Sequence, residues 1–168
     1  MKIETQAQLK SILAYDPQTG LFQWIEKKGL RLPSRAAGSR DPRGYIRIGY
    51  KGERYWAHRL AWLYVHGEFP PEDVDHINRD RSDNRICNLR LASRNMNNGN
   101  TGKWRTNTSG YRGVSWDKRA LKYECYIWKL DKKHHLGYYD DPKEAAAVYN
   151  MNARSYFGDY ATINEIAA

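Results

Sequence analysis

The chain has 168 residues, a length that fits one or two small domains, and 40% of them are hydrophobic, enough to build cores. It carries 28 Lys and Arg residues against 19 Asp and Glu residues, a formal net charge of +9 that suits a polyanionic partner such as nucleic acid. The two cysteines lie far apart without CxxC spacing, which argues against a zinc centre or a disulfide framework. Their number and spacing fit a reducing, cytoplasmic setting. Neither a signal peptide nor a membrane-spanning run is expected.

The first elements predict a small mixed α+β unit. Residues 6–14 place apolar side chains at helical spacing, residues 16–20 carry a turn signal, and residues 21–25 follow as a strand. Residues 26–43 are basic and rich in Gly, Pro and Ser, which predicts a loop that is either simply solvated or an arm contacting phosphates. The basic residues of this loop are Lys27, Lys28, Arg31, Arg35, Arg40 and Arg43.

A hairpin and two helices are predicted next. Residues 44–50 and 54–57 flank a Lys-Gly pair, a pattern typical of a β-hairpin. Residues 58–66 have one apolar helical face, and Gly67 suits the end of that helix. Ser93 suits the start of another helix, which we expect to include residues 94–98.

From the segment after the first of these helices into the second, oxygen and nitrogen ligands follow one another closely. Asp75, a hard carboxylate, precedes the imidazole of His76 at a predicted strand end, and Asn88 and Asn97 follow. Hydrolysis of a phosphodiester needs an activated water and a cation that stabilises the leaving oxygen. This set supplies a metal ligand, a general base, an amide that fixes the base or bridges the loop, and a second oxygen ligand.

Five short stretches within residues 57–98 share a recognisable pattern. They are Ala57-His58-Arg59-Leu60-Ala61-Trp62, Asp75-His76-Ile77-Asn78, Asp83-Asn84-Arg85, Asn88-Leu89-Arg90, and the helix start from Ser93 to Asn97. Together they resemble an HNH endonuclease of the ββα-metal fold, in the phage and homing-endonuclease branch.

The resemblance implies a role for each motif residue. His76 is expected to be the general base, Asp75 and Asn97 to hold one divalent cation, and Asn88 to orient His76 or hold the loop. A neutral amide is a weaker ligand than a carboxylate, so Mg²⁺ or Mn²⁺ is favoured and no structural zinc is expected. His58 is expected to pack beneath the site, with contact to DNA as the alternative. The arginines expected to brace a phosphate are Arg59, Arg85 and Arg90.

The remainder predicts a second module behind a linker. Residues 99–108 are rich in Gly, Asn and Thr, which favours flexibility. Strands are expected at residues 113–116, 123–130 and 134–138. A helix should follow from Asp141 to about Tyr156, because Asp suits its N-cap and the next residue is a proline.

Residues 109–164 also carry a family pattern, in the stretches 109–116, 123–127, 135–140, 144–149 and 157–164. They resemble an AP2 DNA-binding domain, a family that places a three-stranded sheet in the major groove with a helix packed behind it. Trp128 stands where plant members usually carry Arg, so base preference does not carry over, and both Trp116 and Trp128 could instead be sheet core. The residues implied to contact DNA are Arg112, Trp116, Lys118 and Trp128.

The predicted architecture is therefore α+β: an HNH nuclease domain over residues 1–98 (core 44–98, N-terminal extension 1–43), a linker over 99–108 and an AP2-like domain over 109–168. The predicted function is metal-dependent hydrolysis of phosphodiester bonds in double-stranded DNA by a phage or homing-type enzyme, working in the host cytoplasm if phage-encoded. A catalytically inactive, sequence-specific DNA-binding protein on the same scaffold is the main alternative, and an RNA-directed protein is the second. No membrane and no small-molecule cofactor are expected. The target, the choice between a nick and a double-strand break, and the choice between monomer and dimer stay open.

Overall fold

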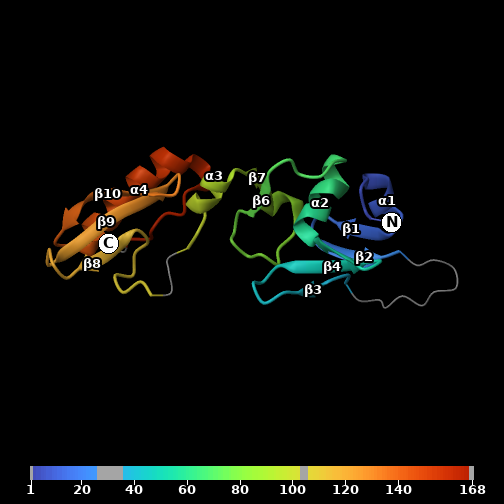
Figure 1. Cartoon of the computed structure of the whole chain (residues 1–168), viewed down its shortest axis with the longest axis horizontal. Coiled ribbons are helices and arrows are strands. Elements are labelled where there is room, and N and C mark those ends of the chain that lie inside the picture. The colour runs from blue at the N-terminus through green and yellow to red at the C-terminus, as the bar shows by residue number, and fades with distance from the viewer. Residues whose placement is uncertain (1, 26–35, 103–105, 167–168) are drawn as a thin grey trace. The chain divides into compact units, whose positions relative to one another are not determined.

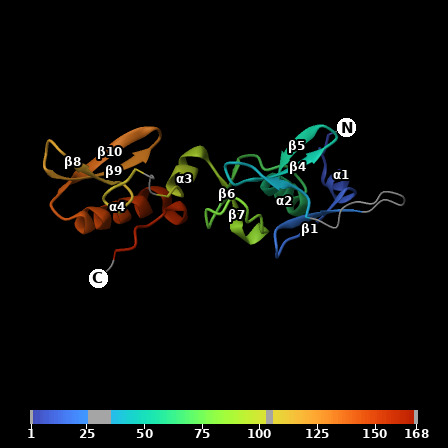
Figure 2. The same cartoon turned by 90° about the horizontal axis from the view of Figure 1, so that it is seen from below.

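A computed structural model describes residues 2–25, 36–102 and 106–166 (Figures 1 and 2). The contacts divide the chain into two compact units, Met1–Ala92 and Ser93–Ala168. Of the predicted basic loop, Lys27, Lys28, Arg31 and Arg35 lie outside the described residues. Within the described ranges, the helices fall short of the length and apolar character needed to cross a membrane.

The first unit is built from short antiparallel pairs of strands around one longer helix. Its strands pair as β1–β2, as β3–β4–β5 and as β6–β7. Its elements in chain order are α1 (Gln6–Lys10), β1 (Leu13–Asp16), β2 (Leu21–Trp24), β3 (Ser39–Arg40), β4 (Ile46–Tyr50), β5 (Glu53–Trp56), α2 (Ala57–His66), β6 (Asp73–His76), the 3-10 helix η1 (Ile86–Asn88) and β7 (Leu89–Ala92).

The first helix is shorter than predicted. A capping box formed by Thr5 and Gln8 starts α1, but the helix ends at Lys10 and the chain continues as β1. Leu13 is fully buried in that strand and pairs with Trp24 of β2. The prediction of a helix to residue 14 was wrong because apolar residues close together in sequence fit either period over so short a stretch.

The hairpin β4–β5 and the helix α2 form as predicted. Lys51 and Gly52 both have positive φ, 48° and 82°, as a two-residue turn of a tight hairpin requires. Gly67 ends α2 in the left-handed conformation, and its N–H donates to the carbonyl of Leu63. The unit's core gathers around α2 and the β1–β2 pair; its fully buried large side chains are Leu9, Leu13, Phe22, Ile48, Leu60 and Leu63.

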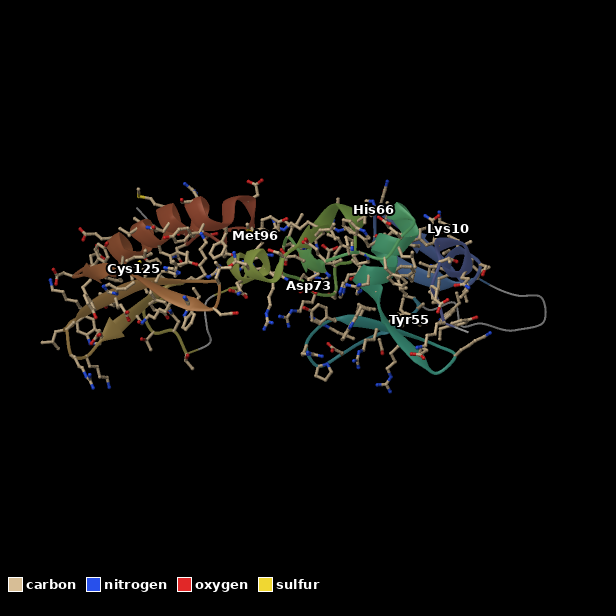
Figure 3. The ribbon with its side chains drawn as sticks, turned by 45° about the horizontal axis from the view of Figure 1, so that its top comes forward. Lys10, Tyr55, His66, Asp73, Met96 and Cys125 are labelled. Carbon is tan, nitrogen blue, oxygen red and sulfur yellow. The ribbon has the colours of Figure 1, made fainter. Side chains whose placement is uncertain are left out.

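The second unit is a three-stranded antiparallel sheet with a helix on one face. The sheet order is β10-β9-β8. Its elements are α3 (Arg94–Gly99), β8 (Val114–Asp117), β9 (Lys122–Lys129), β10 (Lys132–Tyr139), α4 (Pro142–Phe157) and the 3-10 helix η2 (Gly158–Tyr160). Asp141 caps α4 and Pro142 opens it, as predicted. Cys125 lies between sheet and helix, where its Sγ donates to the carbonyl of Ala145 at 3.2 Å (Figure 3).

The short helix α3 packs within this second unit. Met96 lies against the second core (Figure 3), and the side chain of Asn95 accepts from the N–H of Leu130 at 3.0 Å. A Cβ on Gly99 would lie 2.6 Å from Cγ of Phe157, so only glycine permits this approach of α3 to α4. The contacts therefore join α3, which carries Asn97, to the sheet and α4.

Candidate functional site

Asp75 and His76 lie at the end of β6 and are almost completely buried, with 8% and 4% of their surfaces exposed. Pairing with β7 sets Asp75 opposite Arg90. The Nε and Nη2 atoms of Arg90 donate to Oδ2 of Asp75 at 3.0 and 2.9 Å. A guanidinium therefore balances the carboxylate, and the ion pair fixes Asp75 beside His76.

The ring of His76 is held by an amide and by a second histidine. Its Nε2 lies 3.3 Å from Oδ1 of Asn84, and the ring of His58 packs edge-on at a centroid distance of 5.2 Å. Burial lowers the pKa of His76, while the bond to Asn84 and the charge of Asp75 oppose that shift. The neutral imidazole, which is the form that accepts a proton, therefore predominates at neutral pH.

Asn88 closes the loop that follows His76. Its Oδ1 accepts from the N–H of Asn78 at 3.0 Å, and its Nδ2 donates to Oδ1 of Asn78 at 3.0 Å and to the carbonyl of Asp83 at 2.8 Å. Of the two roles considered for Asn88, these contacts favour holding the loop. The amide that contacts His76 belongs to Asn84, a member of the stretch Asp83-Asn84-Arg85.

The three arginines expected to brace a phosphate are engaged within the protein. Besides the pairing of Arg90, Arg85 binds both carboxylate oxygens of Asp83, at 2.8 and 2.6 Å, which lowers the pKa of Asp83 to about 2 and raises that of Arg85. Arg59 donates to the carbonyls of Pro70 and Glu72 at 3.2 and 3.3 Å. These guanidiniums thus order the loops around the site, and their contact with phosphate stays a prediction.

A cluster of arginines and aromatic rings lies next to the histidines and was not singled out from the sequence. The guanidinium of Arg47 lies 4.5 Å from the ring centre of Trp56, and that of Arg81 lies 4.8 Å from that of Tyr45. The ring of Tyr45 is in turn 6.0 Å from that of His76. The only signal in the sequence is the alternation of Arg with Tyr and Trp along the β4–β5 hairpin. Stacked guanidiniums so close to a candidate base suit a polyanionic substrate.

His58 has the position of a packing residue beneath His76. It is 7% exposed, and its ring stacks on that of Trp56 at 6.2 Å. Burial, with smaller contributions from His76 and Arg59, lowers the pKa of His58 to about 3, so the ring is neutral. Among the described residues, its Nδ1 is the buried side-chain polar atom that lacks a hydrogen-bond partner.

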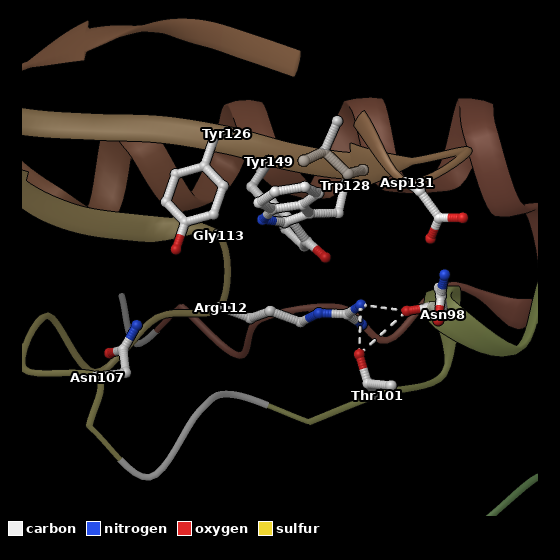
Figure 4. Close-up of a pocket in the computed structure, with 10 residues that line it drawn as sticks. Asn98, Thr101, Asn107, Arg112, Gly113, Tyr126, Trp128, Asp131 and Tyr149 are labelled. Atoms are coloured by element: carbon white, nitrogen blue, oxygen red, sulfur yellow. Dashed lines mark hydrogen bonds between the residues drawn. The ribbon is translucent and has the colours of Figure 1, made fainter. Parts of the chain in front are cut away.

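Arg112 turns into the protein and not toward an open sheet face. It lies beside a cavity of about 360 Å³ in the second unit (Figure 4). Its guanidinium donates to the carbonyls of Asn98 and Gly99, each at 2.6 Å, and to Oγ1 of Thr101 at 2.9 Å. It also lies over the ring of Tyr149 at 5.6 Å. Arg112 thus binds the C-terminal carbonyls of α3, and its contact with DNA stays a prediction.

The other predicted DNA contacts are exposed but do not share one face. Trp116 and Trp128 are 44% and 51% exposed, so neither is sheet core. Trp128 pairs with Lys133, and both lie on the face of the sheet that points away from α4. Trp116 pairs with Tyr123, and both lie on the opposite face, which packs against α4 through Cys125 and Ile127. Lys118 is exposed in the β8–β9 turn.

The oxygen ligands expected for a metal fall in both units, Asp75 in the first and Asn97 in α3 of the second. Within the described ranges, no group of three or more His, Cys, Asp and Glu side chains could hold a metal ion. A cation at Asp75 would therefore depend on carboxylate and amide oxygens completed by water and phosphate. That donor set fits Mg²⁺, which usually keeps several waters and few protein ligands.

The segment that contains these motif residues matches a known family. The family model of the HNH endonuclease covers residues 55–98, from β5 to α3. The chain carries an HNH endonuclease domain. Nucleases of this family generally depend on a divalent metal and act on DNA.

Several known proteins are similar to this HNH-containing chain. It is 29% identical over 121 residues to an uncharacterized HNH endonuclease of Acanthamoeba polyphaga mimivirus, a match that covers 71% of the chain and 62% of that relative. It is 29% identical over 113 residues to Protein 3.8 of Escherichia phage T7, covering 67% of the chain and 91% of that protein. A partial likeness, 37% over 60 residues, covers 36% of the chain and 14% of APETALA2-like protein 2 of Oryza sativa. No solved structure matches the chain.

Proposed function

We propose that this protein is a metal-dependent endonuclease that hydrolyses phosphodiester bonds in double-stranded DNA, of the phage or homing type. The observation that carries the proposal is the buried, neutral imidazole of His76 beside the carboxylate of Asp75, inside the segment that matches the HNH endonuclease family. A base of this kind must be unprotonated and fixed in direction, and both conditions follow from its burial and its contact with Asn84.

Asp75 is the proposed ligand of one Mg²⁺ or Mn²⁺ ion, and Asn97, the second ligand expected from the sequence, stays a prediction because it lies in the other unit. When bound, such a cation supplies stabilisation of the negative charge on the leaving 3′ oxygen. Arg90 holds Asp75 in place by the ion pair to Oδ2. Because that pair keeps a nearly buried carboxylate balanced, the site can exist before metal and DNA arrive.

Other side chains of the first unit take the remaining roles in the proposed reaction. His76 accepts a proton from a water molecule, which attacks the phosphorus in line with the leaving oxygen. Asn88 keeps the loop after His76 closed, and His58 packs against the back of the His76 ring. Arg47 and Arg81, stacked on aromatic rings near His76, bind the phosphates that flank the scissile bond.

The second unit is proposed to bind duplex DNA and to raise the local concentration of DNA at the nuclease site. Two observations support this role: the partial likeness to APETALA2-like protein 2, and an exposed Trp128 on a three-stranded sheet with an exposed Lys118 in its β8–β9 turn. An aromatic and a basic side chain of this kind can pack on sugars and contact phosphates.

A plasmid-nicking assay with Mg²⁺ or Mn²⁺ tests the nuclease proposal. We expect wild-type protein to convert supercoiled plasmid to nicked or linear forms, and His76→Ala to lose at least about a hundredfold in rate with DNA binding retained. His66→Ala is the matched control, because His66 is exposed at the end of α2, where its ring centre lies 4.1 Å from that of Trp62. Full activity of His76→Ala would reject His76 as the base. Wild-type protein that binds duplex DNA but never cuts it would favour the inactive DNA-binding alternative, and preference for RNA over duplex DNA would favour the RNA-directed one.

A further inference from the structure

The cavity of the second unit lies where the strand β8 has ended beside β9 (Figure 4). β8 begins at Val114, which pairs with Cys125, whereas β9 runs on to Lys129. The cavity has a volume of about 360 Å³, and the described residues that line it all belong to the second unit. Sites for small molecules have volumes of about 300–1,000 Å³, so this one suits a single small ligand or one group of a larger one.

A buried hydroxyl points into this cavity. Tyr149, on α4, is 2% exposed, and within the described ranges its hydroxyl has no hydrogen-bond partner in the protein (Figure 4). Gly113 has φ +72°, and a Cβ there would overlap the Tyr149 ring and lie 2.6 Å from the carbonyl oxygen of Tyr126, so only glycine lets the ring reach this place. Burial raises the pKa of Tyr149 to about 12, which keeps the hydroxyl both a donor and an acceptor. Buried polar groups are almost always paired, so this hydroxyl indicates a site for a ligand with a polar edge.

The indole of Trp128 forms an open aromatic wall of the same cavity. It is 51% exposed, and among the tryptophans that the structure describes it is the one that packs against no other ring and no cation. Trp116, by contrast, packs edge-on against Tyr123 at a centroid distance of 4.9 Å. An exposed, unstacked ring binds planar aromatic groups, and nucleobases stack on such rings because every base has a π face.

The polar groups around the cavity suit the edge of a base better than a phosphate. The guanidinium of Arg112 already donates to the carbonyls of Asn98 and Gly99 and to the hydroxyl of Thr101. Asp131 also lines the cavity, and its carboxylate repels a phosphate but accepts hydrogen bonds from the exocyclic amino group of a base. The side-chain amide of Asn98, beside it, both donates and accepts.

We propose that this cavity binds one unpaired nucleobase, which stacks on Trp128 and sets its polar edge against the hydroxyl of Tyr149. The inference rests on the proposed binding of DNA by the second unit and adds a ligand for it. A base in a regular duplex must first be unpaired and unstacked, and this cost is smallest at a bulge or a mismatch. The second unit therefore favours distorted DNA over regular duplex. A free nucleotide offers the same chemistry, and the test separates the two sources.

The test measures binding of full-length protein in EDTA, which withholds the metal from the nuclease site. The probes are two labelled duplexes of one sequence, one with a single bulged base and one in which the bulged nucleotide is abasic. Both carry the same backbone distortion, so the ratio of their dissociation constants isolates the base. We expect wild type to bind the base bulge at least about fivefold more tightly. Trp128→Ala should bring this ratio to about one.

Trp116→Ala is the matched control, because it truncates another exposed tryptophan of the same sheet, 44% exposed and outside the cavity. It should keep the wild-type ratio. Tyr149→Phe removes only the hydroxyl and keeps the ring in the core, so it should lower the ratio at least about twofold with an unchanged melting temperature. Equal ratios in Trp128→Ala and Trp116→Ala would place the base elsewhere and overturn the inference.

A titration with the four deoxymononucleotides identifies the source of the base. The indole N–H signal of Trp128, assigned by its loss in Trp128→Ala, is followed in ¹H–¹⁵N spectra. Equal affinity for the two bulges with an unmoved Trp128 signal overturns the inference. Equal affinity with a shifted signal limits the cavity to free nucleotides and rejects a base of a DNA strand. If the protein binds neither duplex, the proposed DNA binding fails, and the titration still decides whether the cavity takes a base.

Discussion

Replacing Arg112 separates a structural role from a DNA-contacting one. Its guanidinium makes two bonds of 2.6 Å to the carbonyls of Asn98 and Gly99 and lies over the ring of Tyr149. Hydrogen bonds to a charged group contribute about 1.5–3 kcal/mol each, and the cation–π contact about 0.5–2 kcal/mol. Each carbonyl keeps a second donor, however: the N–H of Thr162 for Gly99 and the hydroxyl of Thr101 for Asn98. Both carbonyls therefore keep a hydrogen-bond donor without the guanidinium, so we expect Arg112→Ala to lower the free energy of unfolding by about 2–3 kcal/mol.

For a domain of roughly 60–100 residues, this loss lowers the melting temperature by about 10–20 °C. Differential scanning calorimetry of full-length protein measures it, with Arg112→Lys and Lys118→Ala beside it. Lysine keeps the charge but not the planar fork, so Arg112→Lys should recover only part of the loss. Lys118 is exposed, so Lys118→Ala should leave the melting temperature unchanged and lower DNA affinity. An Arg112→Ala protein with wild-type stability and weakened DNA binding would refute the structural assignment and restore Arg112 to the reading surface.

Three further predictions concern the first unit. Arg90→Ala removes the guanidinium partner of Asp75, so we expect the metal-free protein to lose about 2–3 kcal/mol of unfolding free energy. Mn²⁺ should then raise the melting temperature of Arg90→Ala more than that of wild type. An equal rise in both proteins would show that Arg90 and the metal do not compete for Asp75. The folded-state pKa of His58, about 3, lies below its ordinary value of about 6.5, so protons bind the unfolded state first as the pH falls. The free energy of unfolding should therefore decrease between about pH 6.5 and pH 3, by up to about 1.4 kcal/mol per pH unit. Urea unfolding at several pH values should show that the unfolding free energy depends less on pH in His58→Phe than in wild type. An identical pH dependence in the two proteins would contradict the lowered pKa of His58. Arg47→Ala should reduce the slope of log Kd for DNA against log salt concentration by about one. Arg54 is exposed on the same hairpin, and Arg54→Ala should leave that slope unchanged.

Features with a local cause were predictable from the sequence. Asp141 and Pro142 mark the start of α4 within two residues, and the Lys51-Gly52 pair needs only its own backbone preference to make a tight turn. The strand β7 was not predicted, because four residues starting at Leu89 are too few to show a period and are ordered by pairing with β6.

Partners distant in sequence were not predictable. Tyr15 and Asn84 are 69 positions apart, and neither residue type indicates that the two meet. Arg112 follows a turn in a basic segment, a context equally typical of a DNA contact, and only the packing of α3 against α4 brings two carbonyls to its guanidinium. Local sequence thus predicts which groups are available for chemistry, whereas tertiary packing decides which of them are already engaged.

This distinction bears on what the nuclease motif contains. The matched segment, residues 55–98, includes Asp75 and His76, yet each is fixed from a different direction. Asp75 is held by Arg90 within the β6–β7 hairpin, so the segment supplies its own anchor for the proposed metal ligand. His76 is held by Asn84, whose backbone is supported by Tyr15 from outside the segment. A chain that kept Asp75 and His76 but lost the β1–β2 hairpin would keep the proposed metal ligand and lose the support behind Asn84, and we expect metal binding without cleavage from such a chain.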